Sequence, residues 1–330
     1  MQACEGQCAD VLRAVEIVVA AAWLIGLEYT DCIHGSSLMT HSGSPARAGR
    51  WPLLVGMLLV CALLAAPALA QRAVVVSSIH PLGLMVEALA GGAVDSRVLL
   101  SASASPHDFM LRPSERAALA SAKLVIWMGP ALERPLAELL QRNAAPSLAL
   151  LPAAITDPHV WLDPRAAIAM AQRLSAALVE RRLLAKDEAA ERLSAFEASL
   201  RERENRTAAA LAPLRTVPFL ALHDGYRPFV ARYGLRQVAA LPGDHERQPG
   251  ARSLLALRKA ARESGARCLL QEHGDNVALA QSLSRDLGLQ AVEVDPLART
   301  SRTFDAFLER FAADVQRCLA PEPPISGDRP

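Results

Sequence analysis

The chain has 330 residues, and its 35 basic and 34 acidic side chains leave a net charge of +1. This balance gives no electrostatic reason to expect nucleic-acid binding, because proteins of that class carry a basic surface. Hydrophobic residues make up 52% of the chain and aromatic residues only 4%, a composition that favours helices packed on sheets over an all-β sandwich.

The segment at residues 47–70 has the layout of a cleavable signal peptide. Arginines precede an apolar run, which ends in Ala-Leu-Ala. Pro67 and the small residues at its end favour a signal peptide over a membrane anchor, and the residues before Cys61 lack the small side chain that a lipoprotein site requires. We therefore expect residues 39–70 to be a signal peptide that is cleaved after Ala70.

Residues 1–38 form an extension that is not expected in the protein if synthesis starts at Met39. The alternative is a true N-terminal extension, in which the apolar run at residues 15–26 forms a short membrane segment. The sequence CEGQC at residues 4–8 would then resemble a metal or redox pair, but no second pair accompanies it.

From residue 73 onward, short β-branched runs alternate with helical patterns in two separate sets. The predicted strands are residues 73–79, 96–100 and 123–128 in the first set, and 217–222, 236–241, 266–271 and 289–295 in the second. Such alternation predicts an α/β architecture with parallel-type sheets. We expect two α/β lobes, at residues 71–162 and 214–320, followed by a disordered tail at 321–330.

The two predicted lobes are separated by a helical segment at residues 163–213. Residues 165–212 contain no glycine or proline, and their apolar side chains recur at helical spacing. Asp163 and Pro164 provide an N-cap and a first helical turn. The segment predicts one long linking helix of roughly 70 Å, or two helices with a joint near Lys186 and Asp187.

Cys268 and Cys318 are the two cysteines that remain after residue 70. In an oxidising compartment, such a pair predicts a structural disulfide that closes a loop of about 50 residues and stabilises the fold by about 3–4 kcal/mol. The alternative is a pair of buried free thiols.

Three of the six histidines after residue 70 share a distinctive setting. His107, His159 and His223 each lie at or just beyond the end of a strand or loop, beside an aspartate or proline and close to an aromatic residue. Parallel strands present their carboxyl ends at one edge, where α/β proteins bind ligands. We expect these three imidazoles to converge in the cleft between the lobes, and we interpret His80, His245 and His273 as ordinary surface or hydrogen-bonded residues.

Three neutral imidazoles and one oxygen ligand form a tetrahedral Zn²⁺ site. Asp295, which ends the last predicted strand, is the candidate for the fourth ligand. Asp108 and Asp224 each follow a candidate ligand, and we expect them to orient the imidazole rings rather than bind the metal.

Residues 73–319 resemble the zinc-binding periplasmic component of ABC importers, the ZnuA type of the cluster A-I metal-binding proteins. The resemblance rests on the order of these motifs: SSIHPLGLMVEALAGG, VLLSASASPHDFMLRPSE, LVIWMGPALE, DPHVWLDP, LHDGYRPFVARYGL, DHERQPGA and VEVDPL. It implies two lobes joined by a rigid helix, with the metal held between them. By position, His107, His159 and His223 match metal ligands, Asp295 matches the acidic position near the metal, and Cys268 and Cys318 match a disulfide of the zinc-binding members.

The resemblance implies a periplasmic binding protein, not an enzyme, that holds Zn²⁺ as a transported ligand and delivers it to the permease and ATPase subunits of an importer. We expect a monomer with no nucleic-acid partner. Zinc-binding members often have a histidine-rich loop before the second ligand, whereas residues 133–158 contain no histidine.

Three alternative functions remain: a manganese-binding member of the same family, a secreted zinc hydrolase, and a surface metal-binding adhesin that shares the fold. The Ala-Leu-Ala ending without a lipoprotein site favours a periplasmic protein over the adhesin. Manganese-binding relatives tend to have glutamate at the position of His223, and imidazole favours zinc over manganese. A secreted zinc hydrolase would also use three histidines with an open fourth position. The sequence has no HExxH motif, and no glutamate adjoins a candidate ligand as a general base.

Overall fold

The computed structural model describes residues 72–100, 104–107, 110–143, 146–151, 157–241, 250–273 and 276–320. The predicted signal peptide, the extension before it and the predicted C-terminal tail lie outside these residues, as do Asp108 and His245. Among the helices of the described residues, none is long and apolar enough to cross a membrane.

The N-terminal lobe contains a four-stranded parallel sheet with strand order β2-β1-β3-β4. Its strands are β1 (Ala73–Ser77), β2 (Val94–Val98), β3 (Leu124–Trp127) and β4 (Ser147–Ala149). Its helices are α3 (His80–Ala90), α4 (Pro113–Ser121) and α5 (Arg134–Asn143). All four residues of β3 are buried, which explains why this strand is continuously apolar instead of alternating.

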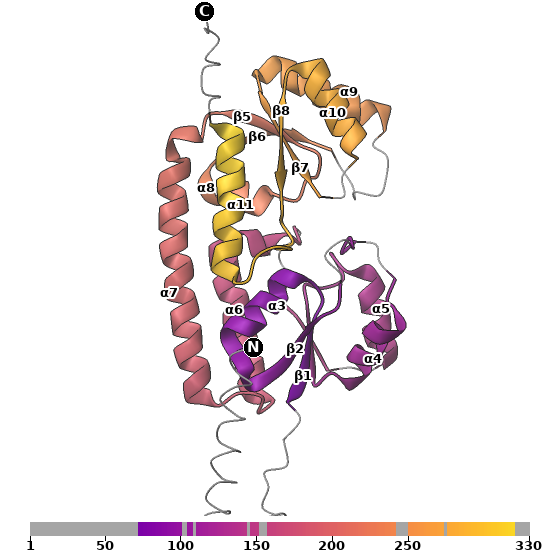
Figure 1. Ribbon diagram of the computed structural model, residues 1–330, viewed down its shortest axis with the longest axis vertical. Helices are drawn as coiled ribbons and strands as arrows, with labels where there is room; N and C mark the ends of the chain where they lie inside the picture. Colours follow the sequence, from indigo (N-terminus) through magenta and orange to yellow (C-terminus); the bar gives the residue numbers. More distant parts are fainter. Residues whose placement is uncertain are drawn as a thin grey trace, which may run out of the picture. The chain divides into compact units, whose positions relative to one another are not determined.

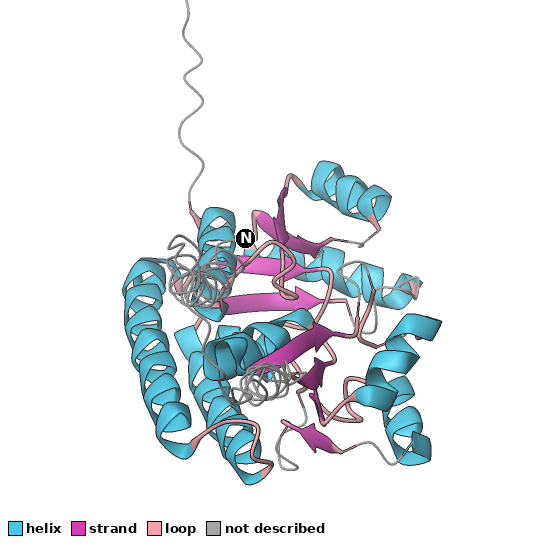
Figure 2. Cartoon of the chain, turned by 60° about the horizontal axis from the view of Figure 1, so that its bottom comes forward, coloured by secondary structure: helices cyan, strands magenta, loops and turns pink. Residues whose placement is uncertain are grey.

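The C-terminal lobe repeats this topology, with strand order β6-β5-β7-β8. Its strands are β5 (Pro218–Ala221), β6 (Arg236–Ala240), β7 (Cys268–Glu272) and β8 (Gln290–Val294). Its helices are α8 (Arg227–Tyr233), α9 (Ala251–Ser264), α10 (Val277–Leu287) and α11 (Phe304–Leu319). Helices lie on both sides of the strands (Figure 2), as expected for parallel sheets.

The segment that links the lobes consists of two helices, α6 (Pro164–Glu180) and α7 (Lys186–Leu211). They run antiparallel, because Gln172 donates a hydrogen bond to Glu197 and Arg165 donates one to Glu204. Helix α7 packs against α3 of the first lobe and α11 of the second (Figure 1). The linking segment is therefore a helical hairpin, and α7 spans about 39 Å at 1.5 Å per residue.

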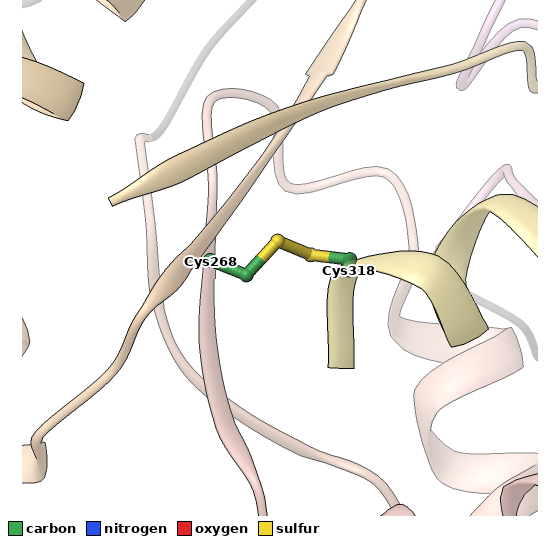
Figure 3. Close-up of a disulfide and its surroundings, with 2 residues drawn as sticks. All are labelled: Cys268 and Cys318. Atoms are coloured by element: carbon green, nitrogen blue, oxygen red, sulfur yellow. A yellow bond between two sulfur atoms is a disulfide. The ribbon is translucent and has the colours of Figure 1, made fainter. Parts of the chain in front are cut away.

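A disulfide joins Cys268 to Cys318, whose Cα atoms are 5.5 Å apart. Cys268 begins β7 and Cys318 lies in the last turn of α11 (Figure 3). This bond confirms the predicted pairing. It fastens the last helix to a central strand of the second sheet, at the end of that strand away from the predicted metal-binding histidines.

Candidate metal centre

The structure brings the three predicted histidines together from three separate places in the chain. His107 lies in the connection that follows β2, His159 precedes the short helix Val160–Leu162, and His223 follows β5. Each can contribute one ring nitrogen to a group in which all the nitrogen atoms lie within 4.8 Å of one another. The predicted convergence of the three imidazoles is therefore present in the fold.

The spacing of two of these nitrogens suits a tetrahedral metal. The Nε2 atoms of His159 and His223 are 3.2 Å apart, and both side chains belong to buried residues, which are 8% and 6% exposed. A tetrahedral Zn²⁺ with bonds of 2.0–2.1 Å places two ligand nitrogens roughly 3.3 Å apart. These two imidazoles thus already have a separation close to that of zinc ligands.

Asp157 orients the ring of His159. Its Oδ1 accepts hydrogen bonds from the backbone N–H and from Nδ1 of His159, both at 3.0 Å. With the proton on Nδ1, the lone pair of Nε2 faces the other histidines. Burial raises the pKa of Asp157, but the hydrogen bonds from His159 and the positive charge of Arg227 outweigh it and lower the pKa below its ordinary value.

Asp157 was not among the residues that we expected from the sequence to contribute to the site. Its signal is the spacing Asp-Pro-His, because an aspartate often accepts a hydrogen bond from the backbone two residues further along. The carboxylate of the predicted orienting residue Asp224 instead pairs with Arg227, and Gln237 Nε2 donates a hydrogen bond to its Oδ1 at 3.2 Å. Ring orientation by Asp224 stays a prediction.

Asp295 is not among the residues whose donor atoms lie together. It follows β8, which is separated from β5 by β7. Two strand spacings put the ends of β5 and β8 roughly 10 Å apart. Oδ1 of Asp295 is nevertheless buried and has no hydrogen-bond partner within the described part of the chain. Its role as a fourth ligand stays a prediction.

Gly225 allows the backbone to approach the imidazoles closely. A Cβ atom at this position would lie 2.5 Å from Cδ2 of His223 and 3.3 Å from Cδ2 of His159. The neighbouring Tyr226 is buried, and its hydroxyl donates a hydrogen bond of 2.8 Å to Oε1 of the buried Glu272. The wall of the site beside His223 is therefore tightly packed and polar.

The described part of the chain also places two of the histidines that we interpreted as ordinary residues. Nδ1 of His80 hydrogen-bonds to the carbonyl oxygen of Ala298 at 2.7 Å. His273 is exposed, with 61% of its side chain accessible, and its Nδ1 lies 3.7 Å from Glu293. Neither belongs to the group of three.

Comparison with known proteins identifies the family. A family model described as "Zinc-uptake complex component A periplasmic" matches residues 75–318. The high-affinity zinc uptake system protein ZnuA of Haemophilus ducreyi is 29% identical over 291 residues, which cover 74% of this chain and 93% of that protein. The protein of the same name from Yersinia pestis is 30% identical over 314 residues, which cover 82% and 98% of the two chains.

Solved structures show the same fold. The crystal structure of ZnuA matches with a TM-score of 0.68 and 22% identity over 76% of this chain and 100% of that chain. The laminin binding protein of Streptococcus agalactiae matches with a TM-score of 0.69 and 22% identity over 75% and 100%. Two parallel α/β sheets, linked through a segment whose long helix α7 packs against both lobes, are thus confirmed. The family comprises periplasmic transport components of high-affinity zinc uptake and not enzymes. The chain therefore belongs to the ZnuA family of periplasmic zinc-uptake proteins.

Proposed function

We propose that His107, His159 and His223 bind the Zn²⁺ ion that this protein carries. The observation that supports the proposal is the group of ring nitrogens within 4.8 Å of one another, contributed by both lobes. Neutral imidazole is a preferred ligand of zinc, and three imidazoles leave one tetrahedral position for an oxygen ligand. Zinc in this site is cargo, so the site must bind the ion and later release it.

Asp295 is the proposed fourth ligand. Its buried Oδ1, which lacks a hydrogen-bond partner within the described residues, would gain a partner by binding the metal. To do so the carboxylate must approach the imidazoles from the end of β8, two strands away from β5. A carboxylate in the fourth position would leave no open site for a hydrolytic water, in keeping with transport.

Membership of a zinc-uptake complex implies permease and ATPase partners. We propose that the protein delivers zinc to them as a monomer and does not bind nucleic acid. We also propose that it reaches the periplasm and that the signal peptide at residues 39–70 is removed. The mature chain would then begin at Gln71, and mass spectrometry of the N-terminal peptide of the exported protein would test this.

Alanine substitution tests the ligand assignment. His107→Ala, His159→Ala and His223→Ala should each weaken zinc binding by at least about 100-fold, because loss of a ligand exceeds the 10–100-fold effect of losing an outer-shell group. His273→Ala is the matched control, since this exposed histidine lies outside the group. Competition with a chelator of known affinity measures all four variants. Equal losses in all four would refute the assignment.

A further inference from the structure

Two side chains, Trp161 and His80, form hydrogen bonds with the segment that follows β8. Nε1 of Trp161 donates a hydrogen bond of 2.8 Å to the carbonyl oxygen of Pro296. Nδ1 of His80 forms a 2.7 Å hydrogen bond with the carbonyl oxygen of Ala298. Trp161 is 1% exposed and Ala298 is 0% exposed, so the bond from Trp161 is buried, whereas the bond from His80 is partly buried. We name residues 295–298 the cross-lobe turn.

The cross-lobe turn has a defined conformation. Ala298 has a φ of 56°, which is uncommon for a residue with a side chain and persists only where surrounding contacts maintain it. The backbone N–H of Ala298 donates to the carbonyl of Asp295, and the N–H of Ser301 donates to the carbonyl of Ala298. The carbonyls of Pro296 and Ala298 are therefore presented to Trp161 and His80 by a folded turn.

Trp161 and the cross-lobe turn are each connected to a residue of the proposed zinc site. Trp161 is two residues after His159, and the centroids of their rings are 5.3 Å apart. Asp295, the proposed fourth ligand, directly precedes Pro296 in the turn. The hydrogen bond from Trp161 thus connects the segment that contains His159 to the segment that contains Asp295.

We propose that Trp161 and His80 form a latch on the cross-lobe turn, and that Trp161 is a positioning residue for zinc. Zinc–nitrogen bonds tolerate deviations of only a few tenths of an ångström, and His159 and His223 come from opposite sides of the cleft. The latch holds these sides at the ligand separation before the ion arrives, which lowers the ordering cost of binding. It also sets the position from which Asp295 approaches. This inference rests on the proposed zinc site.

Trp161→Phe tests the latch, because it keeps an aromatic ring and removes the N–H donor. Trp127→Phe is the matched control: Trp127 is also buried, but its Nε1 has no hydrogen-bond partner within the described residues. The two readouts are the rate of zinc release to excess chelator and the visible absorption of the Co²⁺-loaded protein, which reports the geometry of the ligands.

Trp161→Phe should release zinc about tenfold faster, the effect of one buried carbonyl left without its donor, and should alter the Co²⁺ spectrum. Trp127→Phe should match the wild type in both. A Trp161→Phe protein that melts earlier but keeps the wild-type release rate and Co²⁺ spectrum would overturn the positioning role and leave only a structural one.

The remaining outcomes are also decisive. If Trp161→Phe does not fold, His80→Ala breaks the other bond of the latch and should also release zinc faster than the wild type. The increase should be less than about tenfold, because the Ala298 carbonyl keeps the N–H of Ser301 as a donor. Wild-type behaviour of that variant would overturn the inference. A wild-type protein that does not bind zinc would refute the proposed site itself before any variant is compared. The failure of the latch and the failure of the site are therefore distinguishable.

Discussion

The side-chain carboxyl group of Glu133 is fully buried in the N-terminal lobe. It is 0% exposed, and its Oε2 accepts hydrogen bonds from the backbone N–H groups of Met128 and Gly129. Burial raises its pKa from 4.5 to about 7, although these hydrogen bonds oppose the change. The folded protein therefore holds a proton on Glu133 at pH values where the unfolded chain has lost it.

This difference predicts a pH-dependent stability. Between pH 4.5 and about 7, the folded state binds more protons than the unfolded state, so the free energy of unfolding should fall as the pH rises through this window, by about 3 kcal/mol. The Glu133→Gln variant cannot titrate at this position, so its free energy of unfolding should not show this decrease with rising pH. Urea unfolding at several pH values measures it.

The control for this prediction is Glu138→Gln. Glu138 is an exposed residue of α5, with 64% of its side chain accessible, and its replacement should keep the wild-type slope. A Glu133→Gln protein whose stability varies with pH as steeply as that of the wild type would show that Glu133 does not carry the proton.

Residue types and local spacing were sufficient to find the three histidines, because each follows an apolar run and adjoins an aspartate or a proline. They were not sufficient to place Asp295. Its distance from His223 depends on strand order, and nothing in the sequence of VEVDPL shows that β7 lies between β5 and β8. Asp157 was missed for a different reason: its role depends on a turn of two residues, which Asp-Pro-His permits but does not require.

At the scale of elements, the disulfide fastens α11 to β7 at the end of the strand opposite to the candidate metal site. Replacement of Cys268 and Cys318 by serine should lower the free energy of unfolding by about 4 kcal/mol, the chain-entropy value for a loop of 50 residues. Zinc affinity of the folded protein should be unchanged, since the ligands lie at the carboxyl ends of the strands.

Denaturant unfolding and a zinc competition titration on the same double variant separate these two effects. Addition of a thiol reductant to the wild type should reproduce the loss of stability and should not affect the double variant. A large loss of zinc affinity in a folded double variant would contradict the structural role assigned to the disulfide.

Some elements could be recognised in the sequence and others could not. Strand LVIW is fully buried and strand AVVVS is buried over its last three residues, and both contain β-branched residues accordingly. Strand β4 is SLA, with no β-branched residue, and exists because β3 offers it a parallel partner. The turn between α6 and α7 contains neither glycine nor proline. Arg182 adopts a φ of 57° there, so the reversal has no strong sequence signal.

At the scale of the whole folded unit, helix α7 connects the lobes through side chains that are well enclosed. Arg203 of α7 is 7% exposed and donates hydrogen bonds to Asp305 and Glu309 of α11. The hydrogen bonds that Arg203 donates to Asp305 and Glu309 raise the pKa of its guanidinium, although burial opposes this change. Arg232 of α8 similarly pairs with Asp163, the N-cap of α6. These contacts hold the two sides of the cleft together independently of the metal.

The most direct test of the account is a competition titration of the metal-free protein with Zn²⁺ and Mn²⁺, with the bound metal quantified at saturation. Three converging imidazoles predict one tightly bound zinc ion per chain, which manganese does not displace. Affinity should decline as the pH falls through about 6.5, where free imidazole becomes protonated. A preference for manganese, or the absence of tight binding by either ion, would contradict the proposal that the three histidines bind zinc.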